Sequence, residues 1–160
     1  MKKYILFLLP LTTFLIFSKC EKDDIVPNLP ASIKNYLDAQ YPGYEAEELD
    51  EETFCNGGKG YEVEIETSGD DELELTFDTE GTLLFTKTEI KTSDLPAAVK
   101  TSVATNFPGY KMKEAGRLDM NGGGVRYEAE LKNGSSVKEV LFETTGTVVC
   151  EEVENENDED

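Results

Sequence analysis

The chain contains one segment twice, and this repetition constrains the fold more than any other feature. Residues 29–44, LPASIKNYLDAQYPGY, return without a gap as residues 95–110, LPAAVKTSVATNFPGY, 66 positions later. Further matches follow in the same order, at an offset of 66 and then of 65: Tyr61 with Tyr127, Phe77 with Phe142, and Gly81 with Gly146. Matches this dense, in one order and almost without gaps, indicate two copies of one module.

Each copy is predicted to open with a helix of about twelve residues. Apolar residues recur there at every fourth position, which places them on one side of a helix: Ile33, Leu37 and Tyr41, then Val99, Val103 and Phe107. Pro30 and Pro96 suit the first helical turn, and Asn28 or Asp94 is available nearby as a cap. The Pro-Gly that follows ends each helix, because proline disfavours a helical residue before it and glycine accepts the positive φ of a turn.

The rest of each copy has the pattern of strands. Residues 61–67 and 72–78 alternate between apolar and polar, which is typical of strands with one buried face. Turns that contain glycine separate these segments. Each module therefore becomes a helix followed by four antiparallel strands. Two such sheets joined edge to edge bury more than one alone, so the predicted fold is α+β, with both helices packed on one face of a joint curved sheet.

The first residues are predicted to be a targeting segment. Lys2 and Lys3 precede an apolar stretch, residues 4–17, that is too short to span a bilayer as a helix. Cys20 follows, as in bacterial lipoprotein signals, where the cysteine is acylated and becomes the mature N-terminus, although Lys19 departs from that pattern. Residues 21–24, EKDD, resemble a signal that sends lipoproteins to the outer cell face. We therefore predict an outer-membrane lipoprotein exposed at the surface. The alternative is an ordinary secreted protein in which Cys20 has no such role.

After this signal a ladder of short motifs occurs twice: LP-x-x-[VI]-K, [YF]-P-G-Y, Y-E-[VA]-E-[IL] and F-[DE]-x-x-G-T. It resembles the PepSY-like proteins, also described as β-lactamase-inhibitor-like, over residues 28–153. The resemblance implies tandem units of a helix and four strands that form a curved sheet. It does not imply inhibition of a β-lactamase, because the contact loops of the secreted inhibitor have no identifiable counterpart in this sequence.

These observations divide the chain into five predicted parts: a signal peptide at 1–19, an acidic tether at 20–28, repeats at 29–91 and 92–153, and a disordered acidic tail at 154–160.

The charge of the chain excludes several functions. Asp and Glu number 34 against 15 Lys and Arg, which gives a net charge of −19, and removal of residues 1–19 would bring it to −22. Such a surface repels nucleic acid and anionic lipid headgroups, so membrane contact is expected only through the lipid anchor. There is no histidine, which removes histidine nucleophile systems, bases and metal ligands. No catalytic constellation appears, and we predict neither an enzyme nor a cofactor.

Five glutamates are predicted to share the outer face of two adjacent strands: Glu62, Glu64, Glu66, Glu72 and Glu74. Like charges on neighbouring strands cost about 0.2–1 kcal/mol a pair. One interpretation is a docking surface for a basic protein or peptide, with enzyme inhibition as one version, and another is a Ca²⁺-responsive module. The simplest is a solvated face that discourages aggregation. Copy two carries Arg126, Lys132 and Lys138 on its strands, so the site should lie mainly in copy one.

Two cysteines and two glycine-rich loops complete the candidates. Cys150 aligns with Phe85 and is predicted to be a small buried side chain, whereas Cys55 lies at a hairpin mouth. A disulfide between them would join the two copies, and the sequence leaves this open. The loops at 57–60 and 122–124 are predicted to be plain turns, because neither is followed by a helix or by the Lys-Ser/Thr of a phosphate-binding loop.

Overall fold

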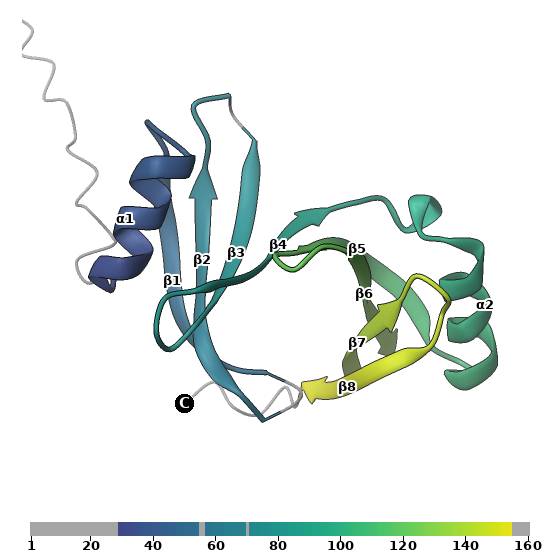
Figure 1. The fold of residues 1–160 in the computed structure, drawn as a ribbon. Coiled ribbons are helices and arrows are strands. Elements are labelled where there is room, and N and C mark those ends of the chain that lie inside the picture. Colours follow the sequence, from purple (N-terminus) through teal and green to yellow (C-terminus); the bar gives the residue numbers. More distant parts are fainter. Residues whose placement is uncertain (1–28, 55–56, 70, 155–160) are drawn as a thin grey trace, which may run out of the picture.

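The structure of the protein is a computed structural model, which describes residues 29–54, 57–69 and 71–154. The elements occur in this order: α1 (Ala31–Gln40), β1 (Glu45–Thr53), β2 (Lys59–Glu66), β3 (Glu72–Asp78), β4 (Leu83–Glu89), a short 3-10 helix (Thr92–Asp94), α2 (Ala97–Asn106), β5 (Lys111–Met120), β6 (Val125–Asn133), β7 (Ser136–Glu143) and β8 (Val148–Glu154). The strands form one antiparallel sheet in chain order (Figure 1). The predicted α+β fold, a helix and four strands repeated in one curved sheet, is confirmed.

Both helices end where the sequence indicates, and α2 begins without its predicted cap. The N–H of Tyr41 donates to the carbonyl of Leu37 at 2.8 Å, and Gly43 then turns the chain with a φ of 85°. Gly109 does the same after α2, with a φ of 90°. Pro96 occupies the N-cap position of α2 rather than its first turn, and no side chain caps that helix. Asp94 belongs to the 3-10 helix, and Asn28 lies outside the described residues.

Each helix packs on its own repeat and encloses a separate core. The core of α1 consists of Ile33, Leu37, Val63, Ile65, Leu75, Phe77 and Leu83. The core of α2 consists of Leu95, Val99, Val103, Phe107, Ala115, Ala129, Leu131, Val140 and Phe142. Figure 1 shows α1 and α2 at opposite ends of the molecule. The apolar residues at four-residue spacing belong to these cores, so the spacing correctly predicted the buried side of both helices.

The two repeats are joined through β4 and β5, which pair from Phe85 with Met120 to Glu89 with Gly116. Lys87 reaches across this seam. Its Nζ lies 3.1 Å from a carboxylate oxygen of Glu74 in the first repeat and 2.7 Å from one of Glu128 in the second. Burial lowers the pKa of Lys87, but the two carboxylates outweigh it and hold that pKa above its ordinary value. Lys87 is therefore charged and bridges both halves of the sheet.

Glycine at the β3–β4 and β7–β8 turns allows each helix to lie close to its sheet. A side chain at Gly146 would collide with the backbone carbonyl of Ala98 in α2, and one at Gly81 would collide with Ser32 in α1. Both glycines also have positive φ, 83° at Gly81 and 82° at Gly146. This double requirement explains why the glycine recurs at the same place in both copies.

Alanine substitutions at two glycines test this close approach. Gly123→Ala should lose about 1–2 kcal/mol of unfolding free energy from the positive φ alone, because its Cβ would meet open space. Gly146→Ala should lose roughly a further 1–3 kcal/mol, since the added methyl overlaps the backbone of α2. Denaturant unfolding of both variants measures the difference. Equal losses would show that the contact with α2 is unimportant.

Candidate binding cavity on the sheet

A cavity of about 400 Å³ lies against the sheet on the surface turned away from each helix core. Four of its residues stand next in sequence to four core residues: Glu62 to Val63, Thr76 to Leu75, Glu128 to Ala129, and Leu141 to Phe142. Because successive side chains of a strand point to opposite faces, the cavity and the helix cores occupy different sides of the strands. Its volume is within the range of ligand pockets in proteins.

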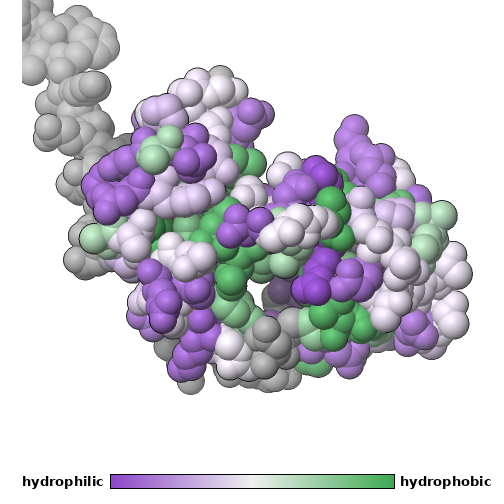
Figure 2. All heavy atoms as spheres, viewed as in Figure 1, coloured by the Kyte–Doolittle hydropathy of each residue, from purple (hydrophilic) through white to green (hydrophobic). Residues whose placement is uncertain are grey.

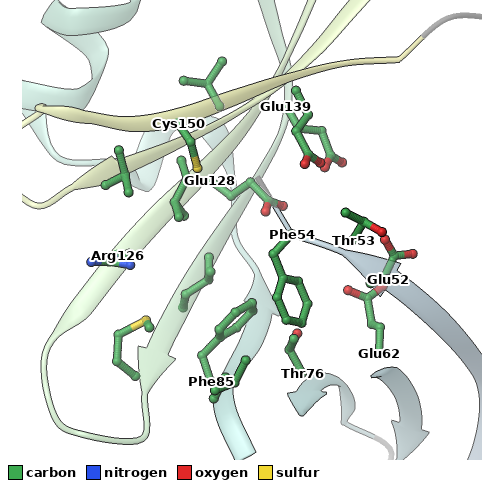
Figure 3. A pocket seen from close by; sticks show the side chains of 17 residues that line it. Glu52, Thr53, Phe54, Glu62, Thr76, Phe85, Arg126, Glu128, Glu139 and Cys150 are labelled. Atoms are coloured by element: carbon green, nitrogen blue, oxygen red, sulfur yellow. The ribbon is translucent and has the colours of Figure 1, made fainter. Parts of the chain in front are cut away.

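The cavity combines an apolar surface with carboxylates. Its apolar residues are Phe54, Leu84, Phe85, Leu118, Met120, Leu141, Val149 and Cys150, together with Val140, which also belongs to the core of α2. Its acids are Glu52, Glu62, Glu128, Glu139 and Glu152. A second hollow of about 560 Å³ shares all five acids and adds Lys87 and Val153. Figure 2 shows apolar surface where the two halves of the molecule meet around this hollow, and Figure 3 shows the side chains converging from both repeats.

Curvature of the sheet brings its two edge strands to the same cavity. Glu52 lies on β1 and Glu152 on β8, the first and last strands in the sheet order, yet both line it. Phe54 follows β1 and folds over Gly60 of β2, where any side chain would collide with its ring. In Figure 3 the Phe54 ring lies between Thr76 and Cys150. The cavity is thus built from both ends and the middle of the sheet.

Equivalent positions of the two repeats face this cavity. With the offsets of 66 and 65, Glu62 corresponds to Glu128, Phe85 to Cys150, and Lys87 to Glu152. In the first repeat Lys87 pairs across the strands with Glu74. In the second repeat Glu152 pairs across the strands with Glu139, the counterpart of Glu74. An ion pair in one copy is therefore replaced by two facing acids in the other.

The basic residues that line the hollows already have carboxylate partners. Lys87 is held by Glu74 and Glu128, as described above. Arg126 contacts Glu143, with its Nε and one terminal nitrogen each 3.0 Å from the same carboxylate oxygen. Each of these positive charges is neutralised by the carboxylates that it contacts. The cavity therefore keeps an excess of acidic side chains.

Burial and neighbouring carboxylates raise the pKa of Glu62 and of Glu152. Burial, the charge of Glu74 and a hydrogen bond to Glu74 raise the pKa of Glu62 to about 8, although Lys87 opposes the shift. Burial and then the charges of Glu52 and Glu128 raise the pKa of Glu152. Glu52, Glu128 and Glu152 come from β1, β6 and β8. The charges of the first two raise the pKa of Glu152, which is consistent with side chains that are close in space although β1 and β8 are at opposite ends of the strand order.

Thr76 adds a buried polar atom to the same surface. Its side chain is 1% exposed, and its hydroxyl has no hydrogen-bond partner among the described residues. Strand pairing places it opposite Glu62 on one side and Phe85 on the other, and all three residues line the cavity. A buried hydroxyl without a partner costs about 1–3 kcal/mol.

The five predicted glutamates lie on two paired strands, and one of them lines the cavity. The register pairs Glu64 with Glu74 and Glu66 with Glu72, as the alternation implies. Only Glu62 of the five lines the cavity. Burial, followed by the charges of Glu47 and Glu48, raises the pKa of Glu64.

The sequence analysis missed Thr76 and four acids of the cavity: Glu52, Glu128, Glu139 and Glu152. The expected bias toward copy one is not seen in this lining, because three of its five acids belong to copy two. The repeat itself was an available signal, since Glu128 is the counterpart of Glu62.

The remaining candidates have mixed outcomes. Cys150 was expected to be a small buried side chain, and it is half-buried and disulfide-bonded; Cys20 and Cys55 lie outside the described residues. The glycine-rich loops are turns, with positive φ at Gly57 and Gly123. In the described part of the chain, no group of three or more Cys, Asp or Glu side chains is placed to hold a metal ion, and no helix is long and apolar enough to cross a membrane. The Ca²⁺-responsive alternative stays a prediction.

The raised pKa of Glu62 predicts a pH dependence of stability. Its ordinary pKa near 4.5 applies to the unfolded chain, and about 8 applies to the folded one, so the folded state binds more protons between these values. Stability should therefore fall as pH rises from about 4.5 to about 8. Glu62→Gln should reduce this fall, with unfolding free energy close to the parent at pH 5 and higher at pH 8. Denaturant unfolding of Glu62→Gln and of the exposed control Glu89→Gln at both pH values checks it. A control-like pH profile for Glu62→Gln would contradict the assignment.

A family model described as "Putative beta-lactamase-inhibitor-like, PepSY-like" matches the chain twice, over residues 19–85 and 85–149. The description is that of an inhibitor-like family and not of an enzyme family. A search of curated proteins finds no match.

Solved structures with this fold come from Bacteroides. A BLIP-like protein from Bacteroides fragilis is 22% identical, with a TM-score of 0.53, and the match covers 86% of this chain and 96% of that one. A DUF2874 family protein from Bacteroides uniformis is 16% identical, with a TM-score of 0.56 and coverages of 79% and 90%. A protein from Bacteroides eggerthii, described as a putative periplasmic protein, is 15% identical, with a TM-score of 0.56 and coverages of 79% and 89%. At these identities the likeness shows the fold alone.

Proposed function

The chain belongs to the PepSY-like, β-lactamase-inhibitor-like family, and on this premise we propose that it is a non-enzymatic protein of the cell envelope that binds a protein or peptide. The binding surface is the face of the strands that carries the cavity. The observation that carries the proposal is the cavity itself, which draws residues from the first and last strands and from the seam between them.

Continuity of the strand pairing supports a single binding surface. Lys87 and Phe85 occupy alternate positions of β4, and their partners Leu118 and Met120 occupy alternate positions of β5. All four line one or both of the hollows, so the cavity face continues from one repeat into the next across the seam. A continuous face with apolar centre and polar rim has the anatomy of a protein interface.

The charge of this surface defines the partner. A net charge of −19 and five glutamates around the cavity attract a basic surface and speed its encounter. The exposed side chains of Val149 and Val153 on β8 add apolar contacts beside the acids. The partner is therefore a protein or peptide with a basic patch. Inhibition of an envelope or extracellular enzyme is one form that such binding takes.

A pair of charge-reversal variants tests the proposed surface. Glu139→Lys with Glu152→Lys reverses two acids of the cavity, whereas Glu80→Lys with Asp94→Lys makes the same charge change at exposed sites outside it. The parent protein, immobilised as bait, should capture an envelope protein at physiological salt. The cavity variant should lose at least about ten-fold in capture, which corresponds to roughly 1.4 kcal/mol, while the control retains it. Equal capture by both variants, or none by the parent, would contradict the proposal.

We further propose that the protein is a lipoprotein held in the outer membrane by acylation of Cys20 and exposed at the cell surface. Support comes from the signal-like residues 1–19, the position of Cys20 directly after them, and the acidic residues that follow. The periplasmic description of the Bacteroides eggerthii structure fits an envelope location for the fold.

Substitution of one cysteine tests the anchor. Cys20→Ala should abolish labelling by a palmitate analogue and release the protein from the membrane fraction, because no other part of the predicted leader offers an acylation site. Cys150→Ala serves as the control, since Cys150 is not adjacent to the signal. Unchanged labelling of Cys20→Ala would rule out the anchor.

A further inference from the structure

We propose that the cavity receives one large apolar side chain of the docked protein, phenylalanine, leucine or methionine, from an extended segment that also carries lysine or arginine. This inference rests on the proposed function and specifies the part of the partner that enters. Three observations carry it: apolar residues that belong to neither helix core, an open volume beside them, and acids that line the same volume.

The cavity contains an apolar cluster that is separate from both helix cores. We call it the seam cluster, and its half-buried or exposed members come from both repeats: Phe54, Leu84, Phe85, Met120, Leu141 and Val149. None of them belongs to the core of α1 or of α2. Val149 is 41% exposed, and the rings of Phe54 and Phe85 contribute to the lining (Figure 3). The seam cluster therefore has apolar surface that the described part of the fold leaves open.

Equivalent positions of the two repeats supply this cluster. With the offsets of 66 and 65, Phe54 corresponds to Met120 and Leu84 to Val149. Strands with one buried face usually carry polar residues outside their core. Each repeat instead places an apolar residue at both of these positions and directs it to the cavity. This repetition favours a role for the seam cluster over a chance exposure.

The space beside the seam cluster is too large for a packed core. Protein interiors hold few voids larger than a water molecule, whose share of liquid volume is about 30 Å³. The cavity measures about 400 Å³. If the seam cluster served only to join the two repeats, its side chains would close on one another. The open volume is that of a ligand pocket, and it admits one large side chain.

The acids of the cavity select what accompanies the apolar side chain. Glu52 and Glu152 line both the apolar cavity and the second hollow, so acidic and apolar surfaces adjoin. In an extended segment, side chains two positions apart point to the same side. A basic residue two positions from the apolar one is therefore placed to meet the acids. Burial of the apolar side chain supplies affinity, and the charges supply orientation and a faster encounter.

Other occupants fit this cavity less well. Residues 155–160 contain no apolar side chain, so they supply no such anchor. A second copy of the chain brings the same acids and a net charge of −19, and like charges across an interface oppose association. The observations therefore favour a different protein that offers a basic segment with one large apolar residue.

A titration with short peptides tests the cavity directly. N-acetyl-Lys-Gly-Phe-Gly-Lys-amide, added to the isotope-labelled protein, should shift the backbone NMR signals of Phe85 and Leu141 with a Kd on the order of 1 mM. The signal of the exposed Thr101 on α2 should not move. Replacement of phenylalanine by alanine, or of both lysines by glutamate, should weaken binding at least about ten-fold. Equal binding of either replacement peptide, or no shift with the parent peptide, would overturn the inference.

Two valines of β8 provide a matched pair of variants. Val149 lines the apolar cavity, whereas Val153 lines the second hollow alone, and both side chains are exposed. Val149→Ser should weaken binding of the phenylalanine peptide several-fold, and Val153→Ser should change it less than about two-fold. Thermal unfolding of both variants checks that each is folded. If a folded Val149→Ser variant binds this peptide as the parent does, the seam cluster only joins the repeats and the inference is wrong.

The failure of this inference is distinguishable from failure of the proposed function. If the parent captures an envelope protein and Val149→Ser bait captures it equally well, the cavity face binds proteins without an inserted apolar side chain. The inference is confirmed in the complex by two results together. Val149→Ser bait loses the captured protein while Val153→Ser bait keeps it, and alanine substitution of one large apolar residue near a basic residue of that protein has the same effect.

Discussion

The ion pairs of Lys87 with Glu74 and Glu128 are the interaction on which the rest of the structure depends. Each repeat alone has a ten-residue helix and four strands around a small core. Their union needs β4 and β5 to pair, and Lys87 holds carboxylates of both halves at that seam. Gly116 makes this possible, because its missing side chain leaves room for the Lys87 stem, whose atoms would lie 3.1–3.3 Å from an added Cβ. A half-buried charge with two partners favours one register over its neighbours.

Much of the fold was predictable because the same sequence pattern occurs in both repeats. The spacing of Leu37 and Val103 identified the buried sides of both helices, and alternation along residues 61–67 identified the strand that carries Glu62 on the face away from the core. The cavity was not predictable in this way. Alternation along a strand predicts which face of the sheet a side chain occupies. The curvature of the sheet depends on the packing of all its strands, and it is this curvature that brings residues of β1 and β8 to the same cavity. Thr76 occupies a polar position of an alternating strand, so the pattern predicts an exposed side chain, whereas in the structure it is buried.

The cavity concentrates features that destabilise the folded chain. Thr76 lacks a partner among the described residues, burial and then the charge of Glu74 raise the pKa of Glu62, and Glu152 pairs across the strands with Glu139. The helix cores show the opposite character, with apolar side chains that are almost fully buried. Local conflicts in an otherwise consistent sequence are expected where function opposes stability. Their convergence on one surface, from two strands of each repeat, favours binding over chance.

The open sheet order has a mechanical consequence. The first and last strands are at opposite ends of that order, so backbone hydrogen bonds do not fix the distance between them. That distance depends on the twist at the single β4–β5 seam, and a small rotation there moves the far ends of both repeats together or apart. The molecule has the geometry of tweezers, with the β4–β5 seam as the pivot and β1 and β8 as the jaws. A change of angle at this seam alters the separation of the jaws while the strand pairing inside each repeat stays the same.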